Sequence, residues 1–282
     1  MDLRKRLQET LGDTYFIDRE LGTPGMSRVF LAQEMALQRT VVVKVLPPDL
    51  AASVNLKRFN REIRLEAKLQ HPHIVPVLTA GVAGGLSYYV MPFIKGETLG
   101  ERLARVGELS VAETVRILSD VLSALAHAHK EGVVHRDIKP DNILLSDDHA
   151  VVADFGVAKA LSAAMDPTSS LTSGGIALGT PAYMSPEQAS GDPSTDHRAD
   201  IYSVGAMAYQ MLTGSPVFTG RSPQAIFAAH AIQRPQPITS GHPEIPPRLA
   251  ELIMRSLEKR PDDRPQSARE MLAELEKLRA AP

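Results

Sequence analysis

Residues 134–145 read VHRDIKPDNILL, and this stretch decides how the rest of the chain is interpreted. Three further motifs accompany it in one order: VVVKVL at 41–46, ADFG at 153–156 and SPEQ at 185–188. Taken alone, an Asp such as Asp137 in a loop would be a solvated turn residue. The four motifs together are far more specific than any one of them.

The composition is that of an ordinary globular protein, with 43% hydrophobic and 23% charged residues among 282. The formal net charge of -2 gives no basic footprint, so we expect no nucleic-acid partner. The absence of Cys excludes disulfides and thiolate metal sites and is compatible with a reducing cytoplasm. We also expect no secretory signal and no membrane segment, since no run of about 18 apolar residues occurs.

The first ninety residues favour strands with one helix. Residues 14–47 carry β-branched and aromatic runs, and residues 55–70 show helical spacing that ends at Pro72. Apolar runs at 74–78 and 86–90 flank two glycines, which predicts a hairpin.

The remainder favours helices. Ser110 and Glu113 form a capping-box pattern before a helical run that reaches Gly132, and Ser267 with Glu270 repeats the pattern near the end. Other predicted elements are short strands near Val133, 143–145 and 151–153, a loop over 162–180, and helices at 201–212 and 249–257. The layout is a small β-rich unit followed by a larger helical one, and clefts between such units are preferred ligand sites.

The four motifs resemble those of the eukaryotic-like (Hanks-type) protein kinase catalytic domain, particularly the bacterial Ser/Thr kinases, over roughly residues 14–279. The resemblance implies an α+β, two-lobed fold, with a small antiparallel sheet lobe that carries one main helix and a larger, mainly helical lobe. The implied divisions are an amphipathic N-terminal segment (1–13), the N-lobe (14–91), a hinge (92–94) and the C-lobe (95–282), with an activation segment at 154–187.

The resemblance also implies the catalytic roles. Asp137 would accept or orient the proton of the substrate hydroxyl, and Lys139 would lie near the transferring phosphate. Asn142 and Asp154 would bind Mg²⁺ through hard oxygen atoms. Lys44 would reach the ATP phosphates and pair with Glu62, which lies ten positions before Pro72; Glu66 is the competing partner.

ATP is the implied cofactor, with Mg²⁺, or Mn²⁺ as an alternative ion. The phosphate loop departs from the family pattern, because Pro24 and Ser27 stand where glycines are usual, and we expect weakened ATP binding rather than its loss. The residues implied to contact ATP are Gly22, Gly25, Met26 and Ser27 at the phosphates, Val29, Val42 and Leu144 around adenine, and Met91, Pro92 and Ile94 at the hinge.

Further residues match structural or regulatory positions. Asp200 resembles the buried Asp that anchors the catalytic loop, Glu187 and Arg264 a distant ion pair, and Thr180 a threonine that contacts the catalytic residues. His135 and Phe155 resemble apolar spine members. Thr172, with Ser173 beside it, best matches the activating phosphorylation site, and Arg136 before Asp137 is typical of kinases regulated in this way.

The expected function is therefore transfer of the ATP γ-phosphate to Ser or Thr hydroxyls of proteins, with autophosphorylation in the activation loop and a homodimer as the means of doing so in trans. The location would be cytoplasmic, either alone or as the cytoplasmic domain of a longer membrane-anchored protein. Three alternatives stay open to different degrees: a pseudokinase that binds ATP as a regulatory module, a small-molecule phosphotransferase, and a dinucleotide-binding dehydrogenase. The segment GTPAYMSPEQ argues against the small-molecule phosphotransferase, and the strand after the Gly22 loop argues against the dehydrogenase.

Five other histidines show no spacing that is typical of metal ligands. They are His127, His129, His149, His230 and His242.

Overall fold

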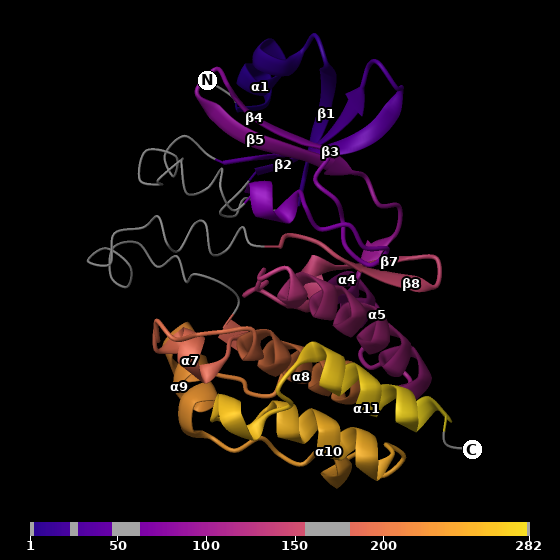
Figure 1. The fold of residues 1–282 in the computed structure, drawn as a ribbon, viewed down its shortest axis with the longest axis vertical. Helices are drawn as coiled ribbons and strands as arrows, with labels where there is room; N and C mark the ends of the chain where they lie inside the picture. The colour runs from indigo at the N-terminus through magenta and orange to yellow at the C-terminus, as the bar shows by residue number, and fades with distance from the viewer. Residues whose placement is uncertain (1–2, 23–27, 47–62, 156–180, 281–282) are drawn as a thin grey trace. The chain divides into compact units, whose positions relative to one another are not determined.

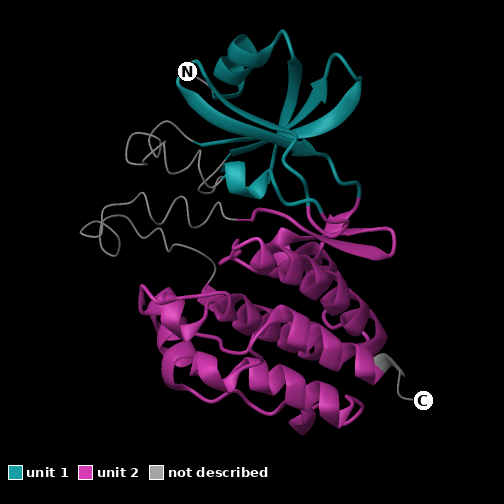
Figure 2. Cartoon of the chain, in the orientation of Figure 1, with its two compact units in different colours: residues 1–70, 75–95, 159–174 teal, residues 71–74, 96–158, 175–282 magenta. Residues whose placement is uncertain are grey.

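A computed structural model describes residues 3–22, 28–46, 63–155 and 181–280 (Figure 1). The chain divides into two compact units, which are coloured separately in Figure 2. Unit 1 comprises residues 1–70, 75–95 and 159–174, and unit 2 comprises residues 71–74, 96–158 and 175–282. No helix among the described residues is long and apolar enough to span a membrane.

Unit 1 is built on a five-stranded antiparallel sheet with the strand order β1-β2-β3-β5-β4. This confirms the strands predicted in residues 14–47. The strands are β1 (Tyr15–Leu21), β2 (Arg28–Glu34), β3 (Arg39–Val45), β4 (Thr79–Ala83) and β5 (Leu86–Pro92).

One face of this sheet packs on the N-terminal helix α1 (Leu3–Leu11), drawn in indigo in Figure 1. Leu7 is completely buried in a cluster with Phe30 and with alternate residues of β3, Val41, Val43 and Val45. Side chains alternate between the two faces of a strand, so Val42 and Lys44 must point to the opposite face. The amphipathic segment predicted over residues 1–13 thus corresponds to a helix that covers the sheet.

The predicted hairpin is present, but its first strand was placed too early. Gly84 and Gly85 make the turn with φ of 55° and 74°, which suits the two-residue turns that join antiparallel strands. The strand before it is Thr79–Ala83, whereas residues 74–78 form no strand apart from an isolated bridge at Ile74. Pro76 explains the difference, because it has no N–H to donate to a strand ladder.

Of the helix predicted over 55–70, only the end lies within the described residues. Residues 63–66 are helical, and both Ile63 and Leu69 are buried, as the spacing predicted.

Unit 2 contains a three-stranded sheet in the order β6-β7-β8 and a set of helices. The strands are β6 (Glu97–Thr98), β7 (Ile143–Ser146) and β8 (His149–Val152). The helices are α4 (Leu99–Val106), α5 (Val111–Lys130), α7 (Pro186–Ala189), α8 (Arg198–Thr213), α9 (Pro223–Ile232), α10 (Pro247–Ser256) and α11 (Ala268–Ala280). Short 3-10 helices occur at Pro140–Asn142, Pro181–Tyr183, Ile238–Ser240 and Pro261–Asp263.

The start of α5 was predicted correctly, although only one of the two hydrogen bonds of the predicted capping box is present. The Ser110 hydroxyl accepts the N–H of Glu113 at 3.2 Å, which satisfies one of the free donors of the first turn. The Glu113 carboxylate, however, accepts from Arg102 at 3.1 Å.

At the other end of α5, the N–H of Val133 donates to the carbonyl of Ala128, and Val133 belongs to no strand. The prediction of a strand near Val133 was wrong, because the backbone N–H of Val133 is bound to the end of α5.

Helix α8 forms the core of unit 2. Thirteen of its sixteen residues are buried, so it is covered on nearly every side. The helix comes so close to α10 that a Cβ added at Gly205 would lie 2.8 Å from the Cβ of Ser256. Its first turn carries the buried Asp200. The position of this carboxylate is therefore set by a helix that is buried on nearly every side.

Candidate active site

The loop that holds the VHRDIKPDN motif is fixed to α8 through Asp200. The Asp200 carboxylate accepts the backbone N–H of His135 at 2.9 Å and that of Arg136 at 2.7 Å, and it lies 2.8 Å from Nε2 of His129. Arg136 has a φ of 69°, a conformation that costs a residue with a side chain about 1–3 kcal/mol unless its surroundings impose it. Asp200 supplies that constraint.

Asp200 is ionised despite complete burial. Burial alone raises the pKa of a carboxyl group, but the hydrogen bond from His129, the electrostatic effects of the His129 and His135 rings and the N–H of Arg136 outweigh it and lower the pKa of Asp200 below its ordinary value. A buried carboxylate with this set of donors is a strong acceptor. His129 belongs to this anchor, a role that sequence reasoning missed because its partner lies 71 positions away.

Asp137, Lys139 and Asn142 form one hydrogen-bonded group. Asp137 Oδ2 accepts from Lys139 Nζ at 2.8 Å and from Asn142 Nδ2 at 3.1 Å. Asn142 Nδ2 also donates to the backbone carbonyl of Asp137 at 2.7 Å. Both bonds engage the amide nitrogen, which turns the amide oxygen of Asn142 away from the Asp137 carboxylate.

Asp154 is connected to this group through backbone contacts. The N–H of Ala153, the residue before Asp154, donates to the carbonyl of Asn142 at 2.9 Å. Asp154 itself has a φ of 67°, another unusual conformation for a residue with a side chain. The carboxylate of Asp154 and the amide oxygen of Asn142 therefore come from two adjoining backbone segments.

The His135 ring contacts both the loop that carries Asp137 and the residue before Asp154. Its Nδ1 accepts the N–H of Asp137 at 3.2 Å, and its Nε2 lies 2.9 Å from the carbonyl of Ala153. The ring is fully buried and meets Phe155 edge-on, with centroids 4.6 Å apart. His135 thereby joins the loop to the strand that leads to Asp154.

Gln188 is a second missed residue. It follows Ser185 by three positions and completes a capping box at the start of α7. Its amide nitrogen also donates to the carbonyl of Arg136 at 2.9 Å. The sequence could have indicated the cap, since Ser185 and Gln188 have the required spacing, but it gave no sign of the bond to the catalytic loop.

Glu187 and Arg264 meet in a two-pronged ion pair, with N–O distances of 2.7 and 2.8 Å. The Arg264 side chain is fully buried and also donates to three backbone carbonyls, those of Glu258, Lys259 and Arg198. All its donors are thus engaged, which is what a buried guanidinium requires. The pair joins α7 to the segment between α10 and α11.

In unit 1, the predicted nucleotide-binding residues gather on one face of the sheet. Val29 lies opposite Lys44, and Val42 opposite Met91. Residues directly opposite each other share a face, and Val42 and Lys44 alternate with the buried core residues of β3. The Lys44 side chain is mostly buried, with 8% of the residue exposed. Pro92 ends β5, and Gly22, the residue after β1, has a φ of 72°.

A family model described as a protein kinase domain matches residues 15–275. The chain belongs to the protein kinase family. The kinase fold predicted from VHRDIKPDN and its companion motifs is confirmed, and members of this family use ATP with a divalent metal ion.

Two relatives and one solved structure illustrate the similarity of this kinase domain to bacterial proteins. It is 41% identical to "Serine/threonine-protein kinase PknB" of Mycolicibacterium smegmatis over 271 residues, which are 94% of this chain and 43% of that protein. It is 39% identical to "Serine/threonine-protein kinase pkn3" of Myxococcus xanthus, over 98% of this chain and 52% of that protein. The chain thus spans about half the length of these relatives or less.

The solved structure is a crystal structure of the PknI kinase domain of Mycobacterium tuberculosis, in a mutant form. The TM-score is 0.73 at 28% identity, covering 94% of this chain and 95% of that one. The likeness extends over nearly the whole of both kinase domains.

Several predicted site residues of the kinase domain lie outside the described residues. They are Gly25, Met26 and Ser27 of the phosphate loop, Glu62, and Thr172, Ser173 and Thr180. Glu66, the alternative to Glu62, is described and is buried, with 4% exposed. Ile94 belongs to unit 1 and Leu144 to β7 of unit 2.

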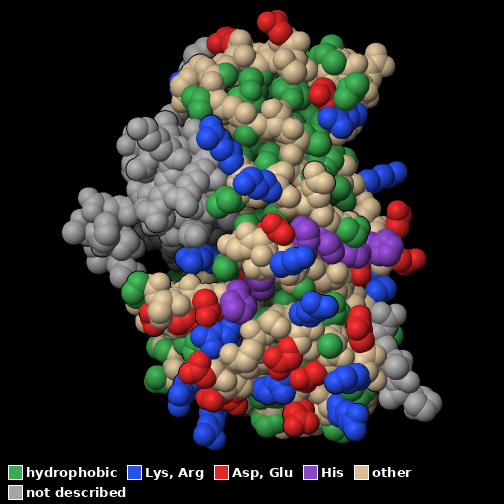
Figure 3. Space-filling model, in the orientation of Figure 1, with side chains coloured by type: hydrophobic (Ala, Val, Ile, Leu, Met, Phe, Trp, Pro, Cys, Tyr) green, Lys and Arg blue, Asp and Glu red, His purple; other side chains and the backbone are tan. Residues whose placement is uncertain are grey.

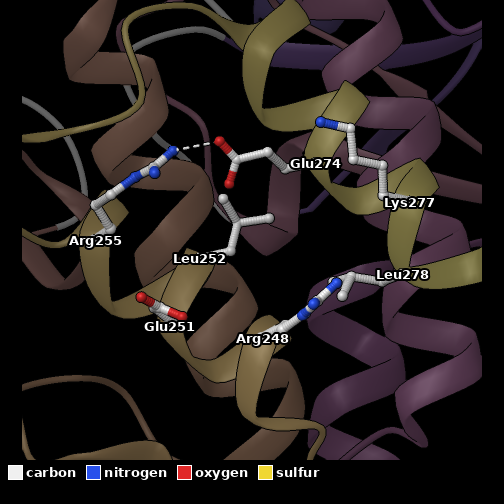
Figure 4. Close-up of a pocket in the computed structure, with 7 residues that line it drawn as sticks. All are labelled: Arg248, Glu251, Leu252, Arg255, Glu274, Lys277 and Leu278. Atoms are coloured by element: carbon white, nitrogen blue, oxygen red, sulfur yellow. Dashed lines mark hydrogen bonds and ion pairs between the residues drawn. The ribbon is translucent and has the colours of Figure 1, made fainter. Parts of the chain in front are cut away.

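A pocket between α10 and α11 contains none of the predicted site residues (Figure 4). Charged side chains dominate its lining, and Arg255 donates across it to Glu274 at 2.7 Å. Its residues are Arg248, Glu251, Leu252, Arg255, Glu274, Lys277 and Leu278. The pocket is therefore separate from the residues that the sequence predicts to carry the chemistry.

Proposed function

We propose that this chain is an active protein kinase that transfers the γ-phosphate of ATP to Ser or Thr hydroxyls of proteins. The observation that carries the proposal is the hydrogen-bonded group of Asp137, Lys139 and Asn142, which Asp200 fixes to the core of unit 2. The similarity to relatives named serine/threonine-protein kinases supports the choice of acceptor.

Asp137 is proposed to orient the substrate hydroxyl and accept its proton. Lys139 and Asn142 both bond Oδ2, so they hold the carboxylate in one orientation and leave Oδ1 for the substrate. Lys139 lies 2.8 Å from the same carboxylate, and its ammonium would neutralise charge that develops on the phosphoryl oxygens. Phosphoryl transfer depends mainly on such positioning and charge neutralisation.

The donor set of Asn142 and Asp154 fits a magnesium ion. One residue offers an amide oxygen and the other a carboxylate, and Mg²⁺ prefers hard oxygen ligands. The hydrogen bonds of the Asn142 amide nitrogen support this assignment, because they fix which end of the amide is the oxygen. The bound ion would neutralise phosphate charge; Mn²⁺ would satisfy the same ligands.

Binding of ATP is proposed for the sheet face that carries Val29, Val42, Lys44 and Met91. Apolar side chains flank the mostly buried Lys44 there, as an adenine ring next to phosphates requires. Glu62 is proposed as the partner of Lys44. The remaining proposed contacts are Gly22, Gly25, Met26 and Ser27 with the phosphates, and Pro92, Ile94 and Leu144 with adenine.

The test is transfer of labelled γ-phosphate from Mg-ATP to the protein itself and to a basic protein substrate. Wild type and the exposed control Asp147→Asn should incorporate label, and Asp137→Asn should lose nearly all of it. Equal labelling by Asp137→Asn would contradict the assignment of the base. No label in any variant, with ATP still raising the melting temperature, would favour the pseudokinase.

Autophosphorylation is proposed at Thr172, with Ser173 as a neighbouring acceptor, through a transient homodimer. A phosphate there could pair with Arg136, whose guanidinium lies 3.3 Å from the carbonyl of Thr195. Phosphopeptide mapping and the activity of Thr172→Ala test this directly. An unmodified loop together with full activity of the variant would refute it.

We also propose a hinge between the lobes at 92–94, an activation segment at 154–187 and a cytoplasmic location. A reaction that consumes ATP and modifies proteins suits that compartment, and the absence of Cys is compatible with it.

A further inference from the structure

Histidine side chains gather on one face of the molecule (Figure 3). Ring contacts connect four of them in a row, His127, His71, His73 and His149, with neighbouring centroids 5.3 to 5.6 Å apart. At one end of this row, His73 and His149 flank the carboxylate of Asp120. One ligand atom from each of these three residues lies within 4.8 Å of the others.

The three residues come from separate parts of unit 2. His73 belongs to the short segment 71–74, Asp120 to α5, and His149 opens β8. Asp120 and His73 are mostly buried, with side-chain exposures of 14% and 17%, whereas His149 is 70% exposed. The group therefore has a rigid inner side and an accessible outer side.

The backbone of Ala150 orients both inner side chains. Its N–H donates to Asp120 Oδ2 at 2.9 Å, and its carbonyl lies 2.9 Å from His73 Nδ1. Because a carbonyl oxygen can only accept, the hydrogen of a neutral His73 ring must be on Nδ1. Metal-binding histidines commonly use this arrangement, in which the second ring nitrogen donates to a backbone carbonyl and the first is directed at the ion.

These bonds leave Nε2 of His73 facing Oδ1 of Asp120 at 3.5 Å, which is longer than an ordinary N–H···O bond. Nδ1 of His149 lies 3.7 Å from Oδ2 of the same carboxylate. In a neutral His73 ring the lone pair of Nε2 therefore faces a carboxylate oxygen, an arrangement that a cation between the two would relieve. Tetrahedral zinc with bonds of 2.0–2.1 Å separates its ligand atoms by about 3.3 Å, close to these distances.

We propose that His73, Asp120 and His149 bind a Zn²⁺ ion, with water in the fourth position. Imidazole nitrogens favour zinc over the magnesium ion proposed for catalysis, because magnesium prefers oxygen ligands. The bound ion would connect the segment 71–74 to α5 and β8. This site is separate from the group around Asp137 and takes no part in phosphate transfer.

The experiment is a titration of the chelator-treated kinase domain with Zn²⁺, in competition with a chromophoric chelator and without ATP. Wild type should bind one ion per chain. His149→Ala and Asp120→Asn should weaken binding by more than about 10-fold, the loss that even outer-shell changes cause. His242→Ala is the matched control, because His242 is also a histidine beside carboxylates, Glu244 and Glu108, and its removal should change nothing.

Cobalt gives a second reading of the same site. The visible absorption of Co²⁺ bound to wild type should disappear in His149→Ala. His149 is mostly exposed, so this variant should keep the wild-type melting temperature even if Asp120→Asn is destabilised. The proposal would be overturned if His149→Ala bound Zn²⁺ as tightly as wild type, or if both site variants did. Asp137→Asn should bind zinc normally, which separates this test from that of the kinase activity.

Discussion

The carboxylate of Asp200 accepts the backbone N–H of Arg136 at 2.7 Å, a contact that joins positions 64 residues apart. It holds Arg136 in a left-handed conformation immediately before the proposed base, Asp137. We therefore propose that Asp200 positions Asp137 through the backbone of the loop, an effect that can be separated from the role of Asp137 itself.

Asp200→Asn is expected to lower both activity and stability. An amide can accept at only one of its two ends, so the N–H of His135 or of Arg136 loses its acceptor. Each buried donor left in this way costs about 1–3 kcal/mol. The measurements are the turnover number, KM for ATP and free energy of unfolding. Asp147→Asn, at an exposed turn, is the control, and an Asp200→Asn protein with the turnover number of wild type would contradict this positioning role.

Removing one member of the Glu187–Arg264 pair should destabilise unit 2 by about 3–5 kcal/mol, because the other charge is left buried. Glu187→Gln measures this by chemical denaturation. The matched control is Glu274→Gln, which removes one member of a half-exposed pair with Arg255 and should cost at most about 1 kcal/mol. Similar losses in both variants would show that burial does not govern the strength of the first pair.

Gln188→Glu tests the bond from α7 to the catalytic loop. The substitution keeps an acceptor for the Ser185 cap but replaces the donor to the Arg136 carbonyl with a negative oxygen. We expect a turnover number reduced by about 10-fold, since loss of a hydrogen bond of about 1.5 kcal/mol corresponds to that factor. Gln233→Glu, on the surface, should behave as wild type. Unchanged turnover in Gln188→Glu would exclude a role for this bond.

His230 should make stability fall as the pH is lowered. Burial, then the charge of Lys259, lowers the pKa of His230 to about 4, whereas the unfolded chain has the ordinary value of 6.5. Below pH 6.5 the unfolded state therefore binds a proton that the folded state does not. The linkage amounts to about 2 kcal/mol of lost stability at pH 5.

This pH dependence is measured by chemical denaturation of wild type and His230→Gln between pH 7 and pH 5. The variant should be less stable at pH 7, because Tyr202 loses the ring nitrogen 2.8 Å from its hydroxyl. Its stability should nevertheless decline less steeply with falling pH. Parallel curves for the two proteins would assign the decline to other groups.

Much of the fold could be predicted from local patterns. The strand over Val41–Val45 and the helix after Ser110 formed where the β-branched run and the capping pattern indicated, because neighbouring residues determine these features. The strand predicted over residues 74–78 was wrong for a local reason too. The prediction gave the apolar residues around Pro76 more weight than the proline itself. The motif residues Asp137 and Asn142 were selected from a short local pattern, and their side chains are hydrogen-bonded to each other in the structure.

The contacts that orient the site could not be predicted in the same way. Gln188 reaches Arg136 across 52 positions, and His129 reaches Asp200 across 71. The spacing of His149 likewise gave no indication of metal binding, because Asp120 and His73 join it only after α5 and β8 pack together. Such contacts depend on tertiary structure, which periodicity and spacing do not encode.

The burial of α8 on nearly all sides has a consequence for how the protein loses activity. The amide hydrogens of α8 should exchange with solvent only when the whole of unit 2 opens, because the helix cannot separate without exposing the core. The N–H groups of His135 and Arg136 are bound to a residue of that helix, so they belong to the same cooperative unit. Heating should therefore inactivate the enzyme in step with global unfolding of unit 2, with no earlier melting of the catalytic loop.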